Sequence, residues 1–313
     1  MLKKSQLLHF IILLVIFFVS SCMPGKMDYN AGSAKILVGK CLVMHFFVSD
    51  KNNQWQSAEK SEILLNRDEA QNWLKNQATH YGVNVDFTNY HYGYYQDIEL
   101  DYIPTNLDGR KYYDLMISDL FSKMEWDTSH NFYIDTKNKS GCDQILILFF
   151  VKGNGISYAL PYNTLPHGKV NPLRYLESAV IFQKYNENTS VRAGTIAHEI
   201  LHLFGADDFY HETRKEIVDR DNQYMVEQAV LLNMNPVLMK GIRSKSRENY
   251  SSSIMSSSWD INNANVDNLT AWIIGWHNTP DQWFEKWARA IDYKRVENTN
   301  LRFRESVIGK FLY

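Results

Sequence analysis

Two long apolar runs constrain the fold of this chain more than any other feature. Residues 36–48 are rich in Val, Leu, Ile and Phe with little polar alternation, and residues 145–151 are consecutive apolar residues. Runs of this kind are typical of strands that are buried on both faces of a sheet. The sequence therefore predicts a buried sheet at the centre of the protein, and its 313 residues are enough to form a sizeable core around it.

The segments around these runs predict helices that alternate with further strands. Residues 62–78 have apolar side chains at helical spacing, and residues 83–87 alternate between apolar and polar. This order along residues 36–205 is typical of an α/β (α+β) protein with a mixed sheet. Residues 206–313 change to helical and irregular segments, which predicts a C-terminal subdomain. Other expected elements are strands over residues 155–160 and 178–182, a half-buried hairpin face at Tyr90, Tyr92 and Tyr94, and a helix from Ser190 or Thr195 to Leu203.

Net charge and cysteine content exclude several classes of function. Lys and Arg number 33 against 35 Asp and Glu, a formal net charge of -2, so the chain has no basic excess with which to bind nucleic acid. The three cysteines, Cys22, Cys41 and Cys142, are too few for a disulfide framework or a Cys-rich metal site. Any metal must therefore be held by His and carboxylate side chains. Cys41 and Cys142 flank the two predicted central strands, and the sequence leaves open whether they form a disulfide.

The first residues are typical of a bacterial export signal. Two lysines precede an apolar stretch over residues 7–19, which is shorter than the roughly 20 apolar residues that span a bilayer. The stretch ends in Val-Ser-Ser-Cys at residues 19–22, which resembles a lipobox, whose Cys is lipidated. We therefore expect removal of residues 1–21, anchoring of the protein through Cys22 to the extracytoplasmic side of a membrane, and a flexible tether over residues 22–35. An ordinary signal peptide is the alternative.

A helical motif carries the chemistry of this chain. In the segment His198-Glu199-Ile200-Leu201-His202, the two His residues are four positions apart, so their imidazoles lie on one face of a helix and can bind one metal ion. Glu199 lies beside that face, where its carboxylate can reach a water on the metal without occupying a ligand position. Two His ligands and a free Glu are typical of a hydrolytic zinc site.

The residues after the motif extend it to a third ligand. Gly205 follows His202 by three positions, where a helix can end in the left-handed conformation that glycine adopts without strain. Asp208 follows three positions later, and its carboxylate oxygen is a suitable third zinc ligand. A fourth position is then left open, as a catalytic zinc site requires.

With these residues in place, the chain resembles the metzincin metalloproteases, whose motif has His, Glu, His, Gly and a third ligand at this spacing. An Asp as third ligand, followed two residues later by Tyr210, resembles the snapalysin-type neutral proteases. The resemblance implies a Met-containing turn beneath the metal, for which Met255 is the candidate. It also implies a twisted mixed sheet with a backing helix and the active-site helix over residues 36–205, and the third ligand and Met-turn within residues 206–313.

The resemblance further implies a zinc-dependent endopeptidase that hydrolyses extracytoplasmic proteins, with Glu199 activating a zinc-bound water as the nucleophile. A monomer is the default oligomeric state. The Tyr that often follows the Met-turn is absent, which leaves Tyr210 and Tyr250 as substitutes. A protein or peptide substrate would lie extended along the predicted edge strand. The candidate residues of that strand are Gly155, Ile156, Ser157, Tyr158 and Ala159.

Two alternatives remain open at this point. A thermolysin-like zinc peptidase would take its third ligand from a later helix, where Glu212, Glu216 and Glu227 are the candidates. A surface-binding lipoprotein with a structural or degenerate metal site is the second alternative. Binding alone would not require the carboxylate of Glu199.

Overall fold

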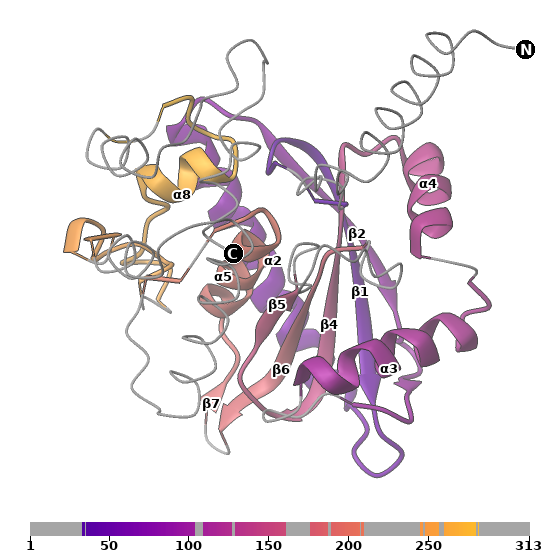
Figure 1. The fold of residues 1–313 in the computed structure, drawn as a ribbon. Helices are drawn as coiled ribbons and strands as arrows, with labels where there is room; N and C mark the ends of the chain where they lie inside the picture. The colour runs from indigo at the N-terminus through magenta and orange to yellow at the C-terminus, as the bar shows by residue number, and fades with distance from the viewer. Residues whose placement is uncertain are drawn as a thin grey trace, which may run out of the picture.

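A mixed sheet forms the centre of the protein in the computed structural model (Figure 1). The predicted signal peptide, Cys22 and most of the predicted tether lie outside the described residues. No helix within the described part of the chain is long and apolar enough to cross a membrane. The structure describes residues 33–34, 36–103, 109–126, 129–160, 176–186, 189–206, 208–209, 245–246, 248–256, 260–279 and 281.

The sheet has seven strands in the described ranges, and its main path runs in the order β2-β1-β4-β6-β5. The strands on this path are parallel except β5, which is antiparallel to β6. Two short strands extend it, β3 parallel to β1 and β7 antiparallel to β6. This arrangement confirms the predicted α/β class and the mixed sheet. The strands are β1 (Gly39–Ser49), β2 (Val85–Tyr92), β3 (Ile98–Glu99), β4 (Gln144–Asn154), β5 (Tyr158–Leu160), β6 (Ser178–Asn186) and β7 (Thr189–Ser190).

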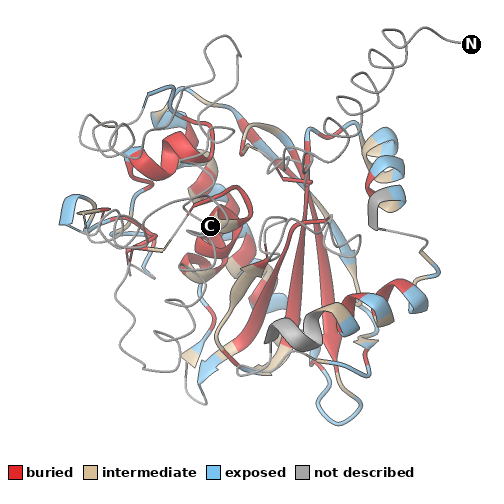
Figure 2. Ribbon diagram, viewed as in Figure 1, coloured by how far each residue is buried: buried red, intermediate tan, exposed pale blue. Residues whose placement is uncertain are grey.

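The two apolar runs form the neighbouring central strands β1 and β4, as predicted. Side chains of a strand alternate between its faces, and in β1 Val43 and Phe47 enter one hydrophobic core while Leu42 and Phe46 enter the other. Both cores are buried, as Figure 2 shows for the central strands. Burial on both faces explains why these runs lack polar alternation.

Helices cover both faces of the sheet and make three layers. On one face lie α2 (Ser57–His80), α5 (Ala193–Leu203) and α8 (Asn268–Ile273), which share one core. The predicted helix over residues 62–78 is the middle of α2. The opposite face packs against α3 (Gly109–Lys123) and α4 (Ser129–Ser140), which were not predicted (Figure 1).

Strand β2 corrects one prediction. We expected Tyr90, Tyr92 and Tyr94 to lie along a hairpin, but β2 ends at Tyr92 and pairs in parallel with β1. Parallel pairing places the 24-residue helix α2 in the connection between the two strands. The tyrosines therefore lie at an edge of the sheet, where Tyr92 stacks on Phe46 with ring centroids 4.8 Å apart.

The opposite edge of the sheet is strand β5, which confirms the predicted edge strand over part of its length. Only Tyr158, Ala159 and Leu160 are in the strand, while Gly155, Ile156 and Ser157 form the connection from β4. Gly155 packs directly against the ring of Phe182, and a Cβ at this position would lie 2.4 Å from that ring. A larger side chain at position 155 would therefore displace the ring of Phe182 in the neighbouring strand β6.

Cys41 and Cys142 are both free and buried, so the structure holds no disulfide between them. Cys41 belongs to the core beneath α2 and α5, whereas Cys142 belongs to the core beneath α3 and α4. Burial, with the nearby carboxylate of Asp143, raises the pKa of the Cys41 thiol far above its usual value. Cys41 therefore serves as a small apolar side chain, while the sulfur of Cys142 accepts a hydrogen bond from the hydroxyl of Ser140 at 3.0 Å.

The end of the predicted tether is ordered against the sheet, which corrects its C-terminal boundary. Ser33 and Ala34 are buried, and the carbonyl oxygen of Ser33 accepts a hydrogen bond from the backbone N–H of Ile145 at 3.0 Å. The carboxylate of the buried Glu177 accepts from the N–H of Ala34 at 2.5 Å. These backbone contacts fix the entry of the chain into the core.

Candidate metal centre

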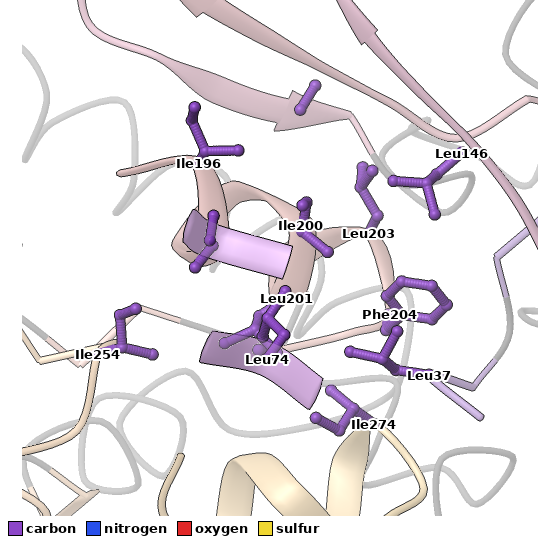
Figure 3. Close-up of a cluster of buried hydrophobic side chains, with 14 of the residues drawn as sticks. Leu37, Leu74, Leu146, Ile196, Ile200, Leu201, Leu203, Phe204, Ile254 and Ile274 are labelled. Atoms are coloured by element: carbon purple, nitrogen blue, oxygen red, sulfur yellow. The ribbon is translucent and has the colours of Figure 1, made fainter. Parts of the chain in front are cut away.

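Helix α5 is buried almost all round, which places its polar residues inside the protein. Ile196, Ile200 and Leu201 pack between the sheet, α2 and the segment around Ile254 and Ile274 (Figure 3). A helix that is hydrophobic on every side is typically a core helix. His198 and Glu199 are nevertheless among its buried residues, with exposed fractions of 2% and 4%. Polar groups buried at this depth require partners.

The helix ends as predicted, in a turn centred on Gly205. Gly205 has a φ of 104°, its N–H bonds to the carbonyl oxygen of His202, and the N–H of Ala206 bonds to that of Leu201. This pair of bonds is a Schellman motif, in which glycine avoids the Cβ strain of a positive φ. The turn returns the carbonyl oxygen of Ala206 to within 2.8 Å of His202 Nδ1. Gly205 therefore fixes one imidazole of the candidate site.

The three candidate ligands converge on one point. Oδ1 of Asp208 lies 3.0 Å from Nε2 of His198 and 3.2 Å from Nε2 of His202, and the two Nε2 atoms are 2.9 Å apart. Zinc bonds of about 2.0–2.1 Å in tetrahedral geometry separate ligand atoms by about 3.3 Å. Within the described part of the chain, these three side chains form the group of His, Cys, Asp or Glu residues that could hold a metal ion.

The hydrogen bonds of both imidazoles leave the facing atoms with lone pairs. Nδ1 of His198 lies 3.0 Å from the carbonyl oxygen of Ile254, and Nδ1 of His202 lies 2.8 Å from that of Ala206. Each Nδ1 therefore carries its hydrogen, and the Nε2 of a neutral ring is then only an acceptor. Oδ1 of Asp208 is buried, and it receives no hydrogen bond when both rings are in this neutral form. In this neutral form the three acceptors repel one another, so the site requires either a metal ion between them or an added proton on one ring, and these residues fit a metal ion.

The electrostatics of the site reflect the same need for positive charge. Burial alone would lower the pKa of His202, but the charge of Asp208 beside it raises that pKa to about 10. Burial alone would raise the pKa of Asp208, but the imidazole of His202 holds it well below its usual range. Without a metal, a proton on His202 supplies the charge that the carboxylate requires.

We expect zinc binding to release a proton, because His202 must give up its extra hydrogen to offer a lone pair. With a pKa of about 10 for the protonated ring, apparent zinc affinity should rise about tenfold per pH unit between pH 6 and 8. Isothermal titration calorimetry in buffers of different ionisation enthalpy measures this release. Asp208→Asn removes the charge that raises the pKa and should reduce the release. Heats independent of the buffer would contradict the assignment.

Glu199 lies beside the three ligands without joining them. Burial raises the pKa of its carboxyl, and the nearby imidazoles of His202 and His198 oppose that rise. Its Oε2 is buried and has no hydrogen-bond partner. A buried carboxylate oxygen that is left unpaired is costly, so a site that keeps one has a use for it. A general base needs such an oxygen, free to take a proton.

The predicted Met-turn lies next to these ligands. Met255 is fully buried in the core that contains α5, and its carbonyl oxygen accepts the N–H of Phe209, adjacent to Asp208, at 2.8 Å. The preceding residue, Ile254, accepts the hydrogen of His198 Nδ1. The turn therefore holds the first and third candidate ligands through two successive carbonyl groups.

Of the two tyrosines expected to replace the missing one, only Tyr250 lies among the described residues. The hydroxyl of Tyr250 donates to the carboxylate of Asp281, and the Tyr250 ring lies 6.1 Å from that of Phe209, the residue after Asp208. Outside the described residues lie Tyr210, Glu212, Glu216 and Glu227.

Sequence reasoning missed the groups that orient the imidazoles. The carbonyl groups of Ile254 and Ala206 have no sequence signal, because every residue carries one. Asp267 supports the Met255 segment from the start of α8, and the sequence does contain a pattern that could have identified it. An Asp directly before an apolar helical segment is a typical N-cap, and its side chain does accept from the N–H of Thr270.

We compared the chain with protein-family models and with curated proteins. No family model and no curated protein matches the chain.

Proposed function

We propose that this chain is a zinc-dependent endopeptidase of the metzincin type, with an Asp as the third ligand. One observation carries the proposal: two imidazole lone pairs and a carboxylate oxygen converge within 3.2 Å, with the unpaired carboxylate of Glu199 beside them. The order of β1, α2, β2, β4, β5, β6 and α5 along the chain is also the order that the resemblance implies. Strand β3 and helices α3 and α4 are inserted between β2 and β4.

The proposed chemistry divides between the ion and the residues of this chain. Zinc, when bound by His198, His202 and Asp208, supplies a Lewis acid that polarises a carbonyl and acidifies water. Glu199 accepts a proton from the attacking water through its unpaired Oε2 and can return it to the leaving amine. The carbonyl groups of Ile254 and Ala206 keep the imidazoles oriented and their Nε2 lone pairs exposed to the ion.

We propose that the substrate is an extended polypeptide bound along strand β5. This strand ends the sheet opposite to β2, and it packs against the active-site helix α5. An edge strand offers backbone N–H and carbonyl groups to an added strand, which gives affinity with little demand on side chains. Tyr158 and Ala159 are partly exposed there and would flank the substrate backbone.

The test of this function is hydrolysis of casein or gelatin by protein that contains one zinc per chain. Removal of the metal with a chelator should abolish hydrolysis, and stoichiometric zinc should restore it. Zinc-loaded protein without hydrolysis would instead support a binding lipoprotein with a structural metal. Hydrolysis that survives complete metal removal would reject the proposed chemistry.

We propose that the mature protein is attached to the extracytoplasmic side of a bacterial membrane through lipidated Cys22. Cys22→Ala should abolish incorporation of a fatty-acid probe and release the protein from membranes, because it removes the proposed acylation site. Cell fractionation with metabolic labelling measures both effects, and Cys41→Ala is the matched control because that thiol is buried in the core. Membrane association of Cys22→Ala protein whose signal has been cleaved would contradict the anchor.

A further inference from the structure

A buried carboxylate lies behind the Met255 segment and outside the candidate ligand set. Asp267 is 4% exposed and precedes α8. Its Oδ1 accepts from the N–H of Thr270 at 2.9 Å, and its Oδ2 accepts from the hydroxyls of Ser253 and Thr270, both at 2.6 Å. Capping of α8 needs only the bonds to Thr270. The bond from Ser253 serves another segment of the chain.

Ser253 passes this interaction to a single peptide unit. Its fully buried hydroxyl donates to Asp267 and accepts from the N–H of Met255 at 3.1 Å. The other end of that peptide is the carbonyl of Ile254, which accepts the hydrogen of His198 Nδ1 at 3.0 Å. Three hydrogen bonds, through the Ser253 hydroxyl and the Ile254–Met255 peptide, thus connect the Asp267 carboxylate to the candidate ligand His198.

We propose that Asp267 is a positioning residue for His198, acting through the Ser253 hydroxyl and the Ile254–Met255 peptide. The proposal rests on the metal centre described above and extends it beyond the ligands. Metal-binding His residues commonly donate to a carboxylate or a carbonyl, which fixes the ring and raises its basicity. Here a carbonyl accepts the hydrogen and a carboxylate polarises the same peptide from its N–H end, because bonds in a chain strengthen one another.

The same turn extends the effect to the third ligand. The carbonyl of Met255 accepts the N–H of Phe209, so a shift of the Ile254–Met255 peptide would also move the backbone next to Asp208. The N–H of Ile254 bonds to the carbonyl of Asn265, which limits such a shift along the chain. The orientation of the peptide plane therefore depends on the bond between Ser253 and Met255.

Two matched variants separate positioning from mere stabilisation. Ser253→Ala and Thr270→Val each remove one hydroxyl that donates to the same Oδ2 at the same distance, but only the first breaks the connection to His198. Ser253→Ala should weaken zinc binding about 10- to 100-fold, the usual effect of losing an outer-shell partner. Thr270→Val should leave zinc affinity within a few-fold even where it lowers the midpoint of urea unfolding. Competition with a chromogenic chelator measures affinity.

A measurement on the metal-free protein keeps this inference separate from the proposed function. The Nδ1–H proton resonance of His198 in nitrogen-15 NMR should move upfield in Ser253→Ala and in Asp267→Asn, because the carbonyl of Ile254 becomes a weaker acceptor. The double variant should resemble the single ones, since both changes break one connection. Equal zinc affinities for Ser253→Ala and Thr270→Val, with an unmoved resonance, would overturn the positioning role. If the variants show the upfield shift but wild-type protein binds no zinc, only the proposed function would be rejected.

Discussion

Replacement of Glu199 by Gln is expected to leave zinc bound and to lower peptide hydrolysis by about two to four orders of magnitude, the usual contribution of a general base. The amide has nearly the same size as the carboxylate, so the buried position beside the ligands remains filled. It cannot accept the proton of the attacking water. Since Glu199 is not one of the three convergent groups, the metal content should stay at the wild-type value. Metal analysis and the initial rate of casein hydrolysis on the same preparation measure both quantities.

Glu177→Gln is the matched control for this prediction. Glu177 is also a buried carboxylate, but it accepts the N–H of Ala34, and it directly precedes β6 rather than lying in α5. Its loss should affect stability and leave the rate per folded molecule unchanged. A Glu199→Gln protein with wild-type turnover would exclude Glu199 as the base. A variant that lost zinc would instead make Glu199 a ligand.

The parts of the fold that the sequence predicts are those with strong local periodicity. The runs at residues 36–48 and 145–151 predicted buried strands, and they form the neighbouring strands β1 and β4. Helix α5 and its end were predictable because imidazole spacing, apolar residues and Gly205 agree on one local structure. Because these signals agree, the start of α5 was predicted to within a few residues and its end at Leu203 was predicted correctly.

The missed features depend on residues far apart in the sequence. Whether β2 pairs in a hairpin or in parallel with β1 is decided by the packing of α2, not by the alternating residues of β2. The partner of His198 Nδ1 is a carbonyl group 56 positions away. A backbone group has the same chemistry at every residue, so only the folded turn can show which one binds the imidazole.

The third ligand gives the largest expected effect on metal binding. Asp208→Ala should lower zinc affinity by more than about 100-fold, which exceeds the usual loss of an outer-shell partner, because two imidazoles would remain without a carboxylate. Asp207→Ala is the control from the sequence: the motif spacing assigns the ligand to position 208, and neighbouring residues of an extended chain point in opposite directions. It should retain zinc and most of the activity. Equilibrium dialysis against a metal buffer measures the affinities.

The same change has a second consequence in the metal-free protein. The charge of Asp208 raises the pKa of His202 to about 10, so Asp208→Ala should let that pKa fall, and proton release on adding zinc should shrink with it. Asp208→His should restore a ligand and remove one negative charge from the site. Water on the bound zinc should then become more acidic, and the acid limb of the pH–rate profile should move to lower pH. If Asp208→Ala kept stoichiometric zinc and a change at Glu212, Glu216 or Glu227 lost it, the ligand set would be thermolysin-like. The approach of Asp208 Oδ1 to within 3.2 Å of both Nε2 atoms is the reason to expect the opposite.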